Sequence, residues 1–176
     1  MNKILLIDGH SILNRAFYGV PPLTNFEGLH TNAVYGFINI MLKSLEDEHA
    51  DYIAVAFDLK APTFRHEMFA EYKGTRKPMP QELHEQVPVI KEVLAAMTIP
   101  VITLEGYEAD DILGTLAKRC QRDGFEVSIL SGDRDLLQLA DEHIKIRMPK
   151  TVKGQTSIEN YYPSDVIDKY QVTPEE

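Results

Sequence analysis

Two acidic clusters contain the residues best suited to chemistry. Glu108-Ala-Asp-Asp111 places three carboxylates within four residues, and Ser131-Gly-Asp-Arg-Asp135 follows about two dozen residues later. Acids are favoured at helix N-termini, but a helix cap does not require three of them. Three carboxylates this close repel one another, and a bound cation would offset that repulsion. Carboxylate oxygens are the ligands that hard divalent cations select. The spacing therefore favours a metal site over a pair of helix caps.

Two more aspartates each end a short apolar run. Asp8 closes the run that starts at Lys3, and Asp58 closes the run that starts at Asp51. Such runs predict buried parallel strands, whose carboxyl ends share the edge where α/β sheets bind ligands. A single aspartate of this kind is as often a helix cap. Because the pattern recurs, we expect Asp8 and Asp58 to join the two acidic clusters.

Helical and strand-like patterns alternate along the rest of the chain. Apolar spacing predicts helices over 31–45, over 82–97 with a kink or break near Pro88, and over 109–120 with Gly124 as its end. Short strands are expected at 99–104, 125–130 and 144–147, and a helical turn at 136–139. From residue 151 the chain is expected to be polar, with a helix beginning at 172–176. The alternation predicts an α/β fold around a parallel sheet. In an extended turn, Asp133 and Asp135 would point the same way and could share one cation.

Composition limits the class of protein. The chain has 176 residues, of which 44% are apolar, enough for one domain with a buried core. Its one cysteine, Cys120, excludes a disulfide within one copy and falls on an apolar helix stripe. No apolar run reaches the length of a membrane span, and the first residues resemble no leader. We expect a cytoplasmic monomer, with a single domain over 1–176 and no membrane contact.

The charge distribution matters more than the total. A net charge of −9 argues against a simple nucleic-acid binder, which usually has an excess of Lys and Arg. Bound divalent ions would reverse the sign at the acidic clusters. Tyr72 precedes the basic stretch Lys73-Gly-Thr-Arg-Lys77, which offers a stacking face beside phosphate partners, although a solvated loop is the alternative. The sequence has neither a Walker-type phosphate loop nor a dinucleotide fingerprint, so no nucleotide cofactor is expected.

Six motifs in register resemble the 5′ nuclease domain of bacterial DNA polymerase I and its stand-alone relatives, the flap endonuclease family. They are Ile7-Asp-Gly-His10, Thr31-Asn-Ala-Val-Tyr-Gly-Phe37, Ala56-Phe-Asp58, Phe64-Arg-His-Glu-Met-Phe-Ala-Glu-Tyr-Lys-Gly-Thr-Arg76, Glu108-Ala-Asp-Asp111 and Ser131-Gly-Asp-Arg-Asp135. The match runs in order over essentially the whole chain. It implies a three-layer, PIN-like α/β fold with a mostly parallel central sheet and a helical arch segment over about 64–97.

The resemblance also implies an activity. Members of the family are metal-dependent nucleases that cut DNA at 5′ flaps and 5′ ends and remove RNA primers paired to DNA, in replication and repair. Two Mg²⁺ ions, with Mn²⁺ as a substitute, would be held by carboxylates. By resemblance, the first ion would take Asp8, Asp58, Glu108, Asp110 and Asp111, and the second Asp133 and Asp135. Two ions about 3.5 to 4 Å apart serve both the attacking and the leaving oxygen of an in-line displacement.

The resemblance assigns the substrate contacts as well. Arg15, Tyr72, Lys73, Arg76 and Lys77 would bind substrate. Lys73 and Arg76 would also add positive charge at the developing phosphorane, so that catalysis is expected to involve Lys73, Arg76, Asp110 and Asp133.

The sequence departs from the family at its end. The family continues with a helix-three-turn-helix element that grips duplex DNA and with two more aspartates for the second ion, and we expect both to be absent here. The chain is then either a piece of a longer protein or a natural short relative, with duplex affinity reduced and its own activity left open.

Two alternatives remain. A PIN-like single-strand ribonuclease would use a similar acidic edge, but it is usually shorter and lacks the arch segment, here Phe64 to Leu94. A non-catalytic nucleic-acid-binding or interaction module belongs to another class, and intact acids at all seven positions argue against a decayed site.

Overall fold

The computed structural model describes residues 1–59, 64–74, 77–153 and 155–176. A six-stranded sheet in the order β3-β2-β1-β4-β5-β6 forms its centre. The strands are β1 (Lys3–Asp8), β2 (Tyr52–Ala56), β3 (Val101–Ile102), β4 (Glu126–Leu130), β5 (Ile144–Val152) and β6 (Gln155–Tyr161). All neighbouring pairs are parallel except β5 and β6, which pair antiparallel. The expected mostly parallel sheet is therefore confirmed.

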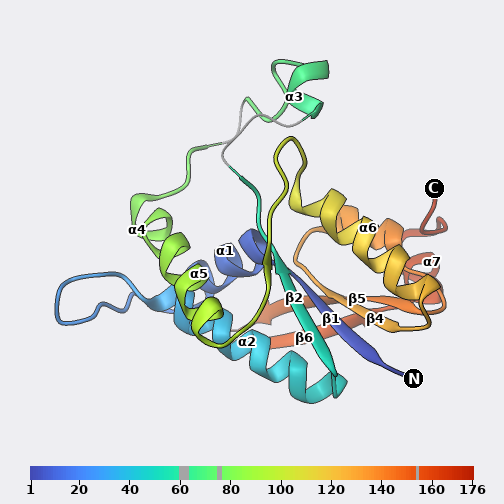
Figure 1. Ribbon diagram of the computed structural model, residues 1–176, viewed down its shortest axis with the longest axis horizontal. Helices are drawn as coiled ribbons and strands as arrows, with labels where there is room; N and C mark the ends of the chain where they lie inside the picture. The colour runs from blue at the N-terminus through green and yellow to red at the C-terminus, as the bar shows by residue number, and fades with distance from the viewer. Residues whose placement is uncertain (60–63, 75–76, 154) are drawn as a thin grey trace.

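Helices cover both faces of the sheet (Figure 1). One face is covered by α1 (Gly9–Gly19), α2 (Asn32–Glu48), α4 (Gln81–His84) and α5 (Gln86–Ala96), and the other by α6 (Ala109–Arg122), the 3₁₀ helix η1 (Arg134–Leu139) and α7 (Pro163–Tyr170). Side chains of a strand alternate between faces. In β1, accordingly, Leu5 and Ile7 pack in the core beneath α1 and α2, and Leu6 packs in the core beneath α6 on the other face. This gives the three layers that the family resemblance implied.

Several local predictions are confirmed. The helix expected at 82–97 is broken at Glu85, close to Pro88, into α4 and α5. Gly124 has a φ of +86° directly after α6, a conformation that glycine adopts at little cost at a helix end.

None of the helices in the described ranges combines the length and the apolar character that a membrane-spanning helix needs.

The prediction for the C-terminal third is wrong in part. The strand expected at 144–147 extends to Val152, and β6 and α7 follow where only polar chain was expected. Along β6 only Tyr161 is buried, so the sequence shows no apolar alternation there. The strand expected at 99–104 shrinks to the two residues of β3. At the end, Glu176 accepts hydrogen bonds from the backbone N–H and the side-chain hydroxyl of Thr173, both at 2.9 Å.

The two ends of the arch segment lie differently on the body of the protein. Its first helix, α3 (Phe64–Met68), stands clear of the sheet layers, and the loop that leads into α6 rises toward it (Figure 1). Its other end is α4 and the start of α5, which pack on α2 and on the core of the α1–α2 face.

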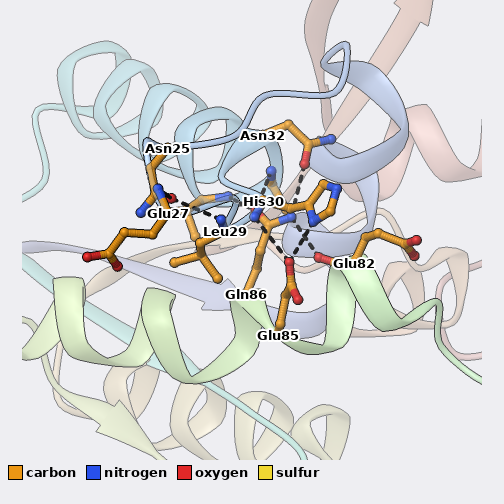
Figure 2. Close-up of polar contacts among 10 residues, drawn as sticks. Asn25, Glu27, Leu29, His30, Asn32, Glu82, Glu85 and Gln86 are labelled. Carbon is orange, nitrogen blue, oxygen red and sulfur yellow. Dashed lines mark hydrogen bonds and ion pairs between the residues drawn. The ribbon is translucent and has the colours of Figure 1, made fainter.

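A buried hydrogen-bond cluster fixes the α4–α5 end (Figure 2). Gln86 is fully buried; its Oε1 accepts the backbone N–H groups of Ala33 at 2.8 Å and Val34 at 3.1 Å, which are unpaired donors of the first turn of α2. Its Nε2 donates to Asn32 Oδ1 and to the Glu82 carbonyl, each at 2.9 Å. We call these five residues the Gln86 hub.

The hub is connected to α1 and to the loop before α2. Asn32 Nδ2 donates to the carbonyls of Phe17 and Val20 at the end of α1. Beside it, Glu85 Oε1 accepts the His30 backbone N–H at 3.1 Å and lies 2.6 Å from His30 Nδ1. The α4–α5 end is thus tied to three neighbouring segments.

Candidate metal and nucleic-acid site

Asp8 lies at the carboxyl end of β1 and is 4% exposed. Its Oδ2 accepts a hydrogen bond of 2.8 Å from the Ser131 hydroxyl, which joins the ends of β1 and β4. Gly9 follows because the ring of Phe57 occupies the space where a Cβ would lie, at 2.6 Å. The pKa of Asp8 is raised to about 7, chiefly by burial; the nearby Asp110 and Asp58 contribute to the shift, while the Ser131 hydrogen bond opposes it.

Asp58 lies two residues past β2 and caps α6. Its Oδ1 accepts the Ala109 backbone N–H at 2.6 Å, so the end of β2 meets the first turn of that helix. Asp110 is the second residue of α6. Burial raises the pKa of Asp110 to about 6, and the charges of Asp133, Glu108 and Asp58 add to the shift, while Lys73 opposes it. These contributions place Asp58, Glu108 and Asp133 within electrostatic reach of Asp110.

The second acidic cluster follows β4. Ser131 Oγ accepts the Asp133 N–H at 3.0 Å, and Asp133 Oδ1 accepts the Asp135 N–H at 2.9 Å. The expected extended turn is therefore wrong, because Asp133 caps η1 and Asp135 lies in its first turn. Asp133 is half-buried beside Asp110, whereas Asp135 is exposed.

The fold thus brings Asp8, Asp58, Glu108, Asp110 and Asp133 to one edge of the sheet. Across the parts of the chain that the structure describes, no three His, Cys, Asp or Glu side chains are arranged to hold an ion in this conformation. The donor set nevertheless fits a hard cation, since it consists of carboxylates, and a bound cation would offset both the burial and the neighbouring negative charges that raise the pKa of Asp8 and of Asp110.

The basic stretch reaches the same edge. Lys73 Nζ lies 2.8 Å from Glu108 Oε1, and the Tyr72 hydroxyl donates to Glu108 Oε2 at 3.5 Å. Lys77 is exposed, and Arg76 lies outside the described residues. Arg15 points elsewhere, because its guanidinium donates to the Pro149 carbonyl of β5.

Sequence reasoning did not single out Arg65, which lies in α3. Its Nη1 and Nη2 donate to Asp111 Oδ2 and Oδ1 at 2.9 and 3.0 Å, and Nη1 also donates to Glu108 Oε2 at 3.2 Å. Asp111 Oδ2 in addition accepts the Glu108 N–H at 3.0 Å. The Arg65 guanidinium lowers the pKa of Asp111, in contrast to its neighbour Asp110. The only hint of this ion pair in the sequence was the third carboxylate of the Glu108-Ala-Asp-Asp111 cluster, because a helix cap does not require so many acids.

A groove of about 1300 Å³ opens beside these residues. Tyr72, Glu108, Asp110 and Arg134 line it together with the apolar side of α6 and η1. The groove therefore gives a large ligand access to the Glu108 and Asp110 side of the acidic edge.

Comparison with known proteins places the fold in a family. The model of the 5′-3′ exonuclease, N-terminal resolvase-like domain matches residues 3–171. DNA polymerase I of Bacillus caldotenax and that of Bacillus subtilis are each 52% identical over 174 residues, which is 99% of this chain and 20% of theirs. The chain therefore spans about a fifth of the length of these relatives.

Solved structures agree on the fold. T5 5′-exonuclease with zinc bound superposes with a TM-score of 0.70 at 19% identity, over 97% of this chain and 62% of that one. The catalytic core of Rad2 in complex with a DNA substrate gives a TM-score of 0.54 at 16% identity, over 99% and 52%. On the family match and the sequence identity together, this chain belongs to the family of 5′-3′ exonuclease N-terminal resolvase-like domains.

Proposed function

We propose that this chain is a divalent-metal-dependent nuclease that hydrolyses phosphodiester bonds at 5′ ends and 5′ flaps of DNA, and of RNA primers paired to DNA. The observation that supports it most directly is the acidic edge at the ends of β1, β2 and β4, with Lys73 beside it. Related folds have been solved with matching ligands: a T5 flap endonuclease with DNA and metal ions, and human GEN1 with a Holliday junction.

We assign six carboxylates to two Mg²⁺ ions, for which Mn²⁺ can substitute. Asp8, Asp58, Glu108 and Asp110 would hold the first ion, and Asp133 and Asp135 would contribute to the second. When bound, the ions supply an acidified water and a Lewis acid for the leaving oxygen. Asp110 is central to this assignment, because Asp58, Glu108 and Asp133 all raise its pKa and so lie within electrostatic reach.

The remaining roles belong to the basic stretch. Lys73 lies against the acidic edge, where its ammonium can stabilise charge that develops on the phosphate. Tyr72 lines the groove beside it and offers a ring on which a base can stack. Arg76 and the exposed Lys77 are proposed to bind the phosphate backbone near the same position.

Cleavage of a 5′-labelled flap duplex in Mg²⁺ or Mn²⁺ tests the proposal. The parent chain should give metal-dependent product, and Asp110→Asn should reduce the rate more than about a hundredfold, because the change removes a charge that holds the ions. Lys118→Ala is the matched control: it removes a charge from the exposed side of α6, where Lys118 pairs with Asp141 at 3.3 Å. Equal rates in the parent and Asp110→Asn, or cleavage that persists in chelator, would contradict the proposal.

A further inference from the structure

Arg65 and Asp111 form the best-aligned ion pair at the acidic edge. Two parallel N–H···O bonds of 2.9 and 3.0 Å join the guanidinium to both carboxylate oxygens, a geometry that fixes orientation as well as distance. The Arg65 side chain is only 32% exposed. The same guanidinium reaches Glu108, so it spans the first and last acids of the cluster.

Both carboxylate oxygens of Asp111 accept hydrogen bonds without a metal. Oδ1 accepts from Arg65, and Oδ2 accepts from Arg65 and from the Glu108 backbone N–H at the start of α6. Asp110 differs, because none of the hydrogen bonds or ion pairs among the described residues involves its side chain. The two neighbouring aspartates therefore have different surroundings: the Asp111 carboxylate is held by the Arg65 guanidinium, and the Asp110 carboxylate is not.

The pair also explains what holds the first end of the arch segment. Met68 and Phe69 are 83% and 60% exposed, so these two side chains contribute little apolar burial between α3 and the body. Arg65, Tyr72 and Lys73 all contact the first turn of α6 through Glu108 or Asp111. Polar contacts therefore contribute to the position of this segment, and contacts that open locally at low free energy can be detected by proteolysis.

We propose that Arg65 and Asp111 are a positioning pair: Asp111 anchors α3 through Arg65, keeps Tyr72 and Lys73 over the acidic edge, and does not serve as a metal ligand. We call this pair the Arg65 clamp. The statement about metal rests on the proposed function, whereas the anchoring of α3 does not. Arg65 acts through Lys73 and Tyr72 and need not touch substrate.

The first test measures anchoring directly, in metal-free protein with chelator. Chymotrypsin can cleave after Phe69 and Tyr72, and the initial rate reports how often the segment opens. Arg65→Gln and Asp111→Asn should each raise this rate about tenfold, and the effect of the double variant should fall well short of the product of the two single effects, because the Arg65–Asp111 pair is lost in both. Arg65→Lys should recover part of the protection, since it keeps the charge but loses the fork. Lys118→Ala should match the parent.

The second test separates the two aspartates by Mn²⁺ binding, measured by calorimetry without substrate. Asp111→Asn should bind Mn²⁺ within about twofold of the parent, whereas Asp110→Asn should bind more than about tenfold more weakly. With a flap duplex, Arg65→Gln should lower kcat about tenfold while KM changes less than about twofold.

Each outcome decides one part of the proposal. Equal loss of Mn²⁺ affinity in Asp110→Asn and Asp111→Asn would make Asp111 a ligand and overturn the proposal. Chymotrypsin rates at the parent level in Arg65→Gln would show that α3 is held by other contacts and would overturn the clamp. A parent chain that binds no Mn²⁺ would contradict the proposed function, and the chymotrypsin rates would still decide whether the clamp exists.

Discussion

The two ends of the arch segment are attached by opposite kinds of chemistry. At the α3 end, the Arg65 clamp and Lys73 use charges that remain partly open to solvent. At the α4–α5 end, the Gln86 hub uses neutral amides that are almost fully buried, with Gln86 at 0% exposure. Partly exposed ion pairs stabilise modestly and respond to salt, whereas a satisfied buried amide is costly to disturb.

The difference suggests that one end of the arch segment is fixed and that the other can move. The hub makes α4 and α5 part of the rigid body, because its hydrogen bonds cap α2 and reach the end of α1. The clamp holds α3 by contacts that a change in local charge can weaken. The proposed polyanionic substrate and divalent cations would both alter the charge at that end, so we expect the α3 end to be the one that adjusts when they bind.

The largest expected effect is on the free energy of unfolding as the pH changes. It arises at the acidic edge beneath the clamp, because Asp8 ionises there, whereas the hub side chains of Asn32 and Gln86 carry no charge. The pKa of Asp8 rises from 3.8 to about 7 on folding. The stability linked to this group is therefore fully present below about pH 4 and is lost as the pH rises through about 7. At about 1.4 kcal/mol per pKa unit, the shift corresponds to about 4 kcal/mol.

Asp8→Asn removes this titration and keeps an oxygen for the Ser131 hydroxyl. In chelator, the variant should exceed the parent in free energy of unfolding by up to about 4 kcal/mol at about pH 8 and match it near pH 4, as measured by urea denaturation. The same gain at both pH values would show that packing, and not ionisation, accounts for the difference.

The next largest effect is expected from a substitution that removes the hydrogen bonds of the hub. Gln86→Ala leaves the backbone N–H groups of Ala33 and Val34 without their acceptor in a buried position. We expect a loss of about 3 kcal/mol in the free energy of unfolding, because each unsatisfied buried donor costs about 1–3 kcal/mol and water can recover part of it.

Gln121→Ala is the matched control for the hub. Gln121 is also a helical glutamine with a side-chain hydrogen bond, 2.6 Å to Asp141, but it is only half-buried. Its loss should cost less than about 1 kcal/mol by urea denaturation. Similar losses in the two variants would mean that the hub is not the stronger attachment.

Much of the fold was predictable because its signals are local. The apolar runs that end at Asp8 and Asp58 predicted β1 and β2, since strands buried on both faces lack polar alternation. Gly124 predicted the end of α6 through its backbone freedom. The position of both aspartates at one edge then followed from parallel pairing of the strands.

The partners of the polar side chains were not predictable in the same way. Gln86 lies on the apolar stripe of its helix, between Leu83 and Ile90, which was a signal for a buried polar role. Nothing local identified α2 as its partner, 52 to 53 residues away. The Arg65–Asp111 pair spans 46 residues. Contacts of this kind depend on how whole helices and strands pack. For the Arg65–Asp111 pair, the sequence offered only the third carboxylate of the Glu108-Ala-Asp-Asp111 cluster as a signal.

The smallest expected effect sharpens the comparison through salt. Because the Arg65 side chain is partly exposed, its ion pair is screened as ionic strength rises. Raising NaCl from about 0.05 M to about 0.5 M should increase chymotrypsin cleavage after Phe69 about threefold in the parent and by a smaller factor in Arg65→Gln, where the Lys73–Glu108 pair remains to be screened. An unstructured peptide with the same cleavage site corrects for salt effects on the protease. If Arg65→Gln shows the same salt dependence as the parent, charges other than the clamp hold α3, and the contrast between the two ends of the arch segment would then rest on the hub alone.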